Sequence, residues 1–91
     1  MKTFYLKPTD SRKSFNNKCH VNEYESDGTK YSDLISYGTR VAYFNHNEQF
    51  ISVQGWFSAT TARHINSFLN FYGFDSMTKK EMESKPEIQL V

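Results

Sequence analysis

The chain has a single cysteine, Cys19, and no long apolar segment. One thiol cannot form an intrachain disulfide, which excludes a small secreted domain held together by disulfides and favours a reducing compartment. No apolar run approaches the about 20 residues of a membrane-spanning helix. The first residues also lack the apolar core of a signal peptide. We therefore expect a soluble cytoplasmic protein.

The chain also has little net charge. Its formal net charge is +1, so no field of the whole chain would attract nucleic acid. The charges are unevenly placed, however. Residues 1–20 carry five basic side chains against Asp10 alone, whereas residues 21–37 are mainly acidic. These two segments could pair across neighbouring strands.

Several catalytic signatures are absent. The sequence contains no glycine-rich phosphate loop, no GxSxG nucleophile motif, no HExxH helix and no paired catalytic carboxylates. The spacing of Cys19, His20, His46 and His64 matches no zinc-binding pattern. We therefore predict a protein that is not an enzyme and that has no cofactor and no metal site.

Aromatic residues are abundant, with eight Phe, six Tyr and one Trp among 91 residues. Each aromatic side chain buries a large area, so a few can build the core of a small domain. Tyrosine also has a polar end, so the six could equally form a contact surface. The length predicts one domain over residues 1–83 and a C-terminal tail, residues 84–91, whose order the pattern does not determine.

The clearest local signal is a helix over residues 58–73. Ser58 is a good N-cap residue, and Gly73 suits the left-handed position after a helix end. Apolar residues recur between them at helical spacing: Ala62, Ile65, Phe68, Leu69 and Tyr72.

A second, short helix is predicted over residues 78–84. Thr78 and Glu81 have the spacing of a capping box, and Met77 and Met82 have that of a hydrophobic staple.

Short strands separated by turn residues account for most of the remaining chain. Asp27-Gly28 is a hairpin signal, and the asparagines within residues 45–48 suit a second turn. We predict an α+β fold, an antiparallel meander of four to five strands with the main helix on one face and the short helix at an edge. The pattern does not show which face is covered, because a shift of one residue exchanges the two faces. The strands are expected at residues 4–6, 19–24, 30–37, 40–44 and 50–53.

The start of the main helix is the first candidate binding site. Thr60 and Thr61 place backbone N–H groups and hydroxyls at the positive end of the helix dipole. Arg63, Asn66 and Asn70 follow as a polar stripe that could reach a phosphate or a carboxylate. The alternative is an ordinary capped helix with a solvated outer side, since every helix has such an N-terminus.

His64 lies at the border between this stripe and the apolar face. We expect its ring to pack against Phe68, one turn away. A general base of a small ribonuclease, acting with Arg63 or a lysine, is the remote alternative. No carboxylate lies nearby in the sequence to orient the ring.

A basic loop is the second candidate binding site. Arg12, Lys13 and Lys18 lie near Tyr5 and Phe15. Positive charge combined with aromatic rings can bind single-stranded nucleic acid. The same loop could contact an acidic protein surface, or could simply be solvated.

The helix entry runs Phe57-Ser-Ala-Thr-Thr-Ala-Arg-His-Ile65. With it, residues 5–21 and 37–74 resemble a family of short uncharacterised proteins encoded by phages, mobile elements and low-GC or gut bacteria. In that family the entry typically reads Tyr-Ser-Ala-Thr-Thr-x-x-His-Ile, so Phe57 replaces a tyrosine here. The family has no established activity. The resemblance implies the cytoplasm of a bacterial host and a protein that acts by binding.

We therefore expect a small non-enzymatic protein that binds another protein, as an accessory protein that inhibits a host or defence factor. The alternatives are a nucleic-acid-binding module that uses the basic loop, a ribonuclease based on His64, and a homodimer that buries the second sheet face. No membrane partner is expected. The candidate binding residues are Arg12, Lys13, Lys18, Thr60, Thr61, Arg63, His64, Asn66 and Asn70.

Overall fold

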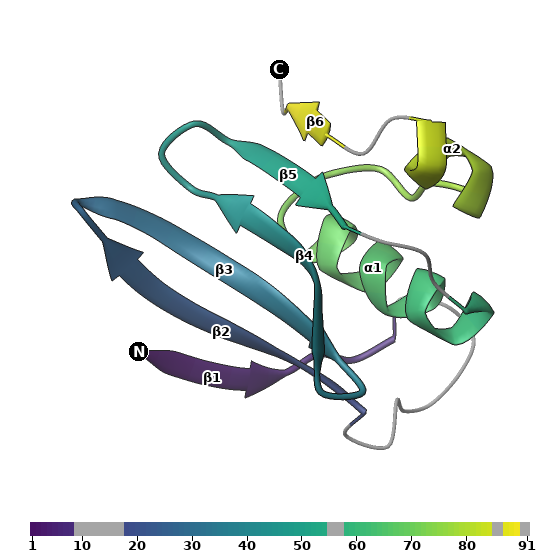
Figure 1. The fold of residues 1–91 in the computed structure, drawn as a ribbon, viewed down its shortest axis with the longest axis horizontal. Helices are drawn as coiled ribbons and strands as arrows, with labels where there is room; N and C mark the ends of the chain where they lie inside the picture. The colour runs from purple at the N-terminus through teal and green to yellow at the C-terminus, as the bar shows by residue number, and fades with distance from the viewer. Residues whose placement is uncertain (9–17, 55–57, 85–86, 90–91) are drawn as a thin grey trace.

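A computed structural model describes residues 1–8, 18–54, 58–84 and 87–89 of the chain (Figure 1). The fold is α+β, as the sequence predicts. Two helices lie in the connection between the last two strands of one sheet. The elements in chain order are β1 (Lys2–Tyr5), β2 (Cys19–Ser26), β3 (Thr29–Ser36), β4 (Thr39–Asn45), β5 (Phe50–Val53), α1 (Ala59–Phe71), α2 (Lys79–Ser84) and β6 (Glu87–Gln89).

The sheet is an antiparallel meander with the strand order β1-β2-β3-β4-β5-β6. Each strand therefore pairs with its neighbour in the sequence, which confirms the predicted topology. The sixth strand was not predicted. It lies within the residues expected to form a tail, and its three residues pair with residues 50–52 of β5.

Residues with positive φ close the hairpins. Asp27 and Gly28 have φ values of 51° and 80°, as a primed turn requires. In the turn between β4 and β5, the left-handed residue is Gln49, with φ 57°, and not one of the asparagines. Asn45 and Asn47 support that turn through their side chains: Asn45 Oδ1 accepts from the Glu48 N–H at 3.0 Å, and Asn47 Nδ2 donates to the Gly28 carbonyl at 3.4 Å.

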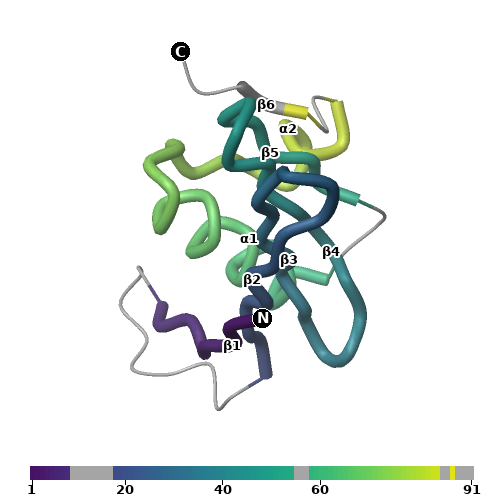
Figure 2. The backbone as a smooth tube through the Cα atoms, turned by 90° about the vertical axis from the view of Figure 1, so that its left-hand side faces the viewer, coloured from purple at the N-terminus to yellow at the C-terminus, as the bar shows by residue number. Residues whose placement is uncertain are grey.

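The core lies between α1 and one face of the sheet, and Figure 2 shows α1 running along one side of the strands. Strand pairing places Val21 opposite Leu34, Leu34 opposite Ala42, and Phe44 opposite Ile51, so these side chains share a face. The structure thus determines which sheet face the helix covers. The fully buried apolar side chains of this core are Cys19, Val21, Leu34, Ala42, Ile51, Ile65, Phe68 and Leu69.

Both helices have the predicted ends. Ser58 Oγ accepts from the Thr61 N–H at 3.2 Å, and Gly73 has φ 90°. At α2, the Thr78 N–H donates to Glu81 Oε1 at 3.1 Å, and the Glu81 N–H donates to Thr78 Oγ1 at 3.2 Å, which is the predicted capping box. Met82 brings α2 into the core and is almost fully buried. Neither helix is long and apolar enough to cross a membrane, among the residues that the structure describes.

Two phenylalanines of α1 provide a test of this packing. Phe68 is fully buried, whereas Phe71 is 57% exposed. We expect Phe68→Ala to lower the free energy of unfolding by about 3–5 kcal/mol, because it removes buried apolar area and leaves a cavity. The control Phe71→Ala should change it by less than about 1 kcal/mol. Urea denaturation of both variants measures the difference. Equal losses of unfolding free energy would show that Phe68 is not more deeply buried than Phe71.

Candidate functional site

Of the three candidate residues in the predicted basic loop, the structure describes Lys18. Arg12 and Lys13 lie outside the residues that the structure describes. Lys18 is exposed, and its backbone carbonyl accepts a hydrogen bond from the Tyr37 N–H at 2.9 Å. Lys18 therefore lies at the same end of the sheet as the turn between β3 and β4.

The polar stripe on α1 holds the chain that follows the helix. Asn66 Nδ2 donates to the Met77 carbonyl at 2.9 Å, and the Met77 N–H donates to Asn66 Oδ1 at 2.7 Å. Asn70 Nδ2 donates to the Phe74 carbonyl at 3.0 Å. These amides satisfy backbone groups beside the core, which would otherwise need other partners. Asn66 and Asn70, predicted as part of a polar stripe that could reach a phosphate or a carboxylate, thus fasten residues 74–77 to α1.

The start of α1 is built into the fold as well. Thr60 and Arg63 are half-buried, whereas Thr61 and His64 are buried. Ser36 joins the two buried side chains: its Oγ lies 3.2 Å from Thr61 Oγ1 and 2.8 Å from His64 Nδ1.

His64 has a structural environment. Its side chain is fully buried, and its ring centroid lies 5.6 Å from that of Tyr37. Burial, with a smaller contribution from the charge of Arg63, lowers the pKa of His64. A general base must reach its substrate, so this fully buried position gives the ribonuclease alternative no support.

A second buried polar group joins β2, β3 and the end of α1. Ser32 Oγ lies 2.6 Å from His46 Nε2, and the Tyr72 hydroxyl lies 2.8 Å from Ser32 Oγ and 3.0 Å from Glu23 Oε2. The serine–histidine pair has the spacing of a nucleophile and its base. Ser32 is fully buried, however, and the carboxylate of Glu23 is hydrogen-bonded to Ser32 and Tyr72. The cluster is therefore a partly buried hydrogen-bond network that connects the helix to the sheet.

The face of the sheet opposite α1 carries a row of aromatic rings. Tyr24 stacks on Tyr31 with a centroid distance of 5.7 Å. Tyr31 and Tyr43 meet edge to face at 6.3 Å, and Tyr43 and Phe50 do so at 5.9 Å. The row thus crosses four strands, β2 to β5. All four side chains are partly exposed.

An arginine lies on this row. Arg40 Cζ lies 5.5 Å above the ring of Tyr43, and Arg40 Nη1 lies 3.8 Å from Asp33 Oδ2. The Tyr24 hydroxyl donates to Asp33 Oδ1 at 3.1 Å. Burial raises the pKa of Asp33, although these two neighbours act in the opposite direction.

We call this surface, made of Tyr24, Tyr31, Arg40, Tyr43 and Phe50, the tyrosine face. It borders a shallow groove of about 410 Å³ that is lined by Tyr24, Ser26, Tyr31, Arg40, Tyr43 and Gln54.

None of the tyrosine face was among the predicted site residues. The signal was present in the sequence, because Tyr31, Tyr43 and Phe50 lie in predicted strands. A single strand does not show whether its aromatic residues point to the core or to the outside, so the signal could not be interpreted without the position of α1.

The described residues contain no group of three His, Cys, Asp or Glu side chains that could hold a metal ion.

The fully buried His64 and the half-buried His46 predict a pH dependence of stability. Burial lowers the pKa of His46 and His64 in the folded protein below the ordinary value of 6.5. Between the folded and the ordinary pKa, the unfolded chain binds more protons than the folded one, so acid favours unfolding. We expect the free energy of unfolding to fall as the pH is lowered from 7.5 through 6.5 towards 5. Urea denaturation across this range measures it, and replacing both histidines by glutamine should flatten the slope.

The Tyr72 hydroxyl gives a second test of the buried networks. Tyr72→Phe leaves Ser32 and Glu23 without this donor, and we expect a loss of about 1–3 kcal/mol in the free energy of unfolding. Tyr5→Phe is the control, since Tyr5 is 58% exposed, and it should cost less than about 0.5 kcal/mol. Similar values for the two variants would show that the Tyr72 hydroxyl is solvated.

Comparison with known proteins gives one match. No curated protein and no solved structure matches the chain significantly. A family model described as a family of unknown function, DUF8033, matches residues 4–84. This range includes α1, α2, the strands β2 to β5 and the last two residues of β1. The match covers most of the chain, so this protein belongs to DUF8033, a family of unknown function.

Proposed function

We propose that this protein is a non-enzymatic binding module and that it contacts another protein through the tyrosine face. The observation that supports the proposal is the row of four partly exposed aromatic rings with Arg40 above it. Tyrosine and arginine are enriched at the energetically dominant positions of protein interfaces.

The side chains of the tyrosine face are already ordered. Each ring of the row contacts the next, and hydrogen bonding to Asp33 fixes the end of Tyr24. A side chain that is fixed before binding loses less conformational entropy when a partner binds. The face is therefore preorganised for association.

The charges of this face favour a protein over a nucleic acid. Arg40 is paired with Asp33, so the two contribute no net charge. Affinity for nucleic acid depends mainly on cations that contact phosphates. The basic loop remains the basis of the alternative, that of a nucleic-acid-binding module, and that alternative stays a prediction. The resemblance to proteins of phages and mobile elements makes a bacterial host or defence protein our first choice of partner.

Affinity capture with matched variants tests the proposal. Tagged full-length protein, Tyr43→Ser and the control Tyr37→Asn are incubated with nuclease-treated bacterial lysate. The Tyr37 side chain is 57% exposed and lies outside the tyrosine face. Its φ is 50°, which asparagine tolerates. We expect Tyr43→Ser to reduce capture of a protein partner at least about tenfold, and Tyr37→Asn to retain it.

Circular dichroism and the melting temperature establish that both variants are folded. Equal capture by the folded Tyr43→Ser variant would overturn the role of the tyrosine face. A bound species that disappears with nuclease would instead support the nucleic-acid alternative.

A further inference from the structure

Exposed apolar side chains gather at one edge of the sheet. In the described part of the chain, four large apolar side chains are more than half exposed: Met1, Tyr5, Tyr37 and Phe71. Three of them lie at or beside β1, since Met1 precedes the strand, Tyr5 ends it, and the Phe71 ring lies 5.2 Å from that of Phe4. Exposed apolar side chains around one strand make this edge a candidate interaction site.

The strand β1 forms one edge of the sheet in the part of the chain that the structure describes. Among the described strands it pairs with β2 alone, so its other side presents backbone N–H and C=O groups without a strand partner. An edge of this kind is a template for a strand from another chain. The opposite edge of the sheet, β6, has only three residues.

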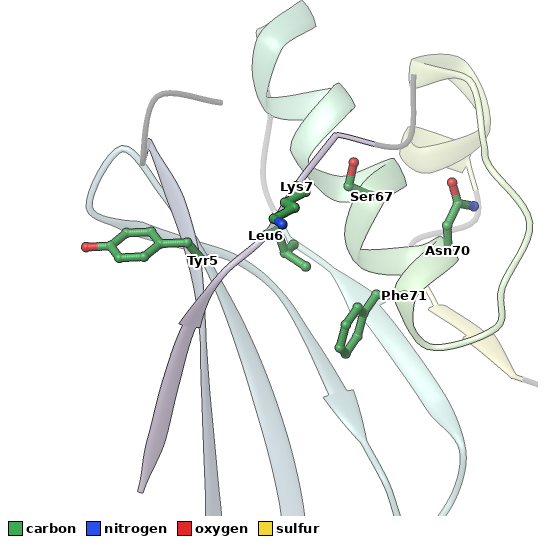
Figure 3. Close-up of a pocket in the computed structure, with 6 residues that line it drawn as sticks. All are labelled: Tyr5, Leu6, Lys7, Ser67, Asn70 and Phe71. Carbon is green, nitrogen blue, oxygen red and sulfur yellow. The ribbon is translucent and has the colours of Figure 1, made fainter. Parts of the chain in front are cut away.

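A groove runs beside this edge. It has a volume of about 420 Å³ and lies between the chain just after β1 and the C-terminal half of α1 (Figure 3). Phe71 lines it from α1, while the Tyr5 ring points away on the other side of the strand. The lining residues are Tyr5, Leu6, Lys7, Ser67, Asn70 and Phe71.

An added strand would use the edge and the groove together. Side chains alternate between the two faces of a strand, and Phe4 points to the helix side, where it contacts Phe71. Every second side chain of a strand added to β1 would therefore point towards Phe4, Phe71 and the groove. In this binding mode the backbone hydrogen bonds give affinity and the pockets for alternate side chains give specificity.

We propose that β1 and this groove bind an extended, acidic segment of a partner protein by strand addition, with an apolar side chain of that segment in the groove. The charges indicate the acidic character. Lys2 is the first residue of β1 and Lys7 lies two residues beyond its end; both are exposed, and none of the described residues that line the groove is acidic. Carboxylates on the same segment would complement both lysines.

The same charges disfavour a second copy of this chain as the occupant. Pairing of two β1 edges would bring Lys2 and Lys7 of one copy close to those of the other, and like charges on facing strands repel. The groove lies between β1 and α1, on the side of the sheet away from the row of rings, so this inference does not depend on the proposed function.

Selection from a random heptapeptide display library on the intact protein tests the inference. We expect the selected peptides to combine apolar and acidic residues. In amide NMR spectra they should shift residues 2–7 and 67–71 and leave residues 31 and 43 unshifted. Lys7→Glu should weaken their binding about fivefold, as expected for an exposed charge pair that is reversed, and Phe71→Ser should weaken it more than about tenfold. The controls Lys80→Glu and Tyr37→Asn should bind as the wild type does.

Four outcomes would overturn the inference. They are a selection without binders, selected peptides that shift the tyrosine face, binders without acidic residues, and binding that survives both edge variants. Sedimentation of the protein alone tests whether a second copy of the chain binds this edge instead. A dimer that the Phe71→Ser substitution dissociates would show that it does.

Discussion

The packing of α1 against one face of the sheet is the contact on which the rest of the structure depends. Ile65, Phe68 and Leu69 are fully buried there, against Leu34 and its neighbours on the central strands. A small antiparallel sheet needs one covered face to be stable, and its other face can remain in contact with water. The position of this one helix therefore separates the core from the surface that is available for binding.

The same contact gives polar residues a structural role. Ser36, Thr61 and His64 lie in the buried layer between helix and sheet and bond to one another. Ser32 and Tyr72 do the same near the end of the helix. A buried polar group is costly unless it is paired, so residue types that are typical of catalysis serve here to orient the helix on the sheet.

The surfaces that can bind a partner lie where the sheet is uncovered. The tyrosine face follows from strand alternation on the side away from α1, and the β1 edge follows from the end of the strand order. The tyrosine face uses no residue of the polar stripe of α1. In that stripe Asn66 and Asn70 hold the chain that leads to α2, and Asn70 also lines the groove beside β1. The surface of the proposed function thus lies on the strands and not on the helix, where the sequence pattern was clearest.

The sequence by itself determined the elements whose signals are local. The cap at Ser58, the capping box at Thr78 and the turn at Asp27-Gly28 each depend on residues within a few positions, and the structure has all three. Hairpin connections then brought successive strands together in the predicted order.

Only the tertiary structure decided which face α1 covers, that residues 87–89 add a strand to β5, and that Tyr72 bonds to Glu23 across 49 positions of the chain. The alternation within a strand is the same whichever side is buried, so the choice depends on contacts between residues distant in the sequence.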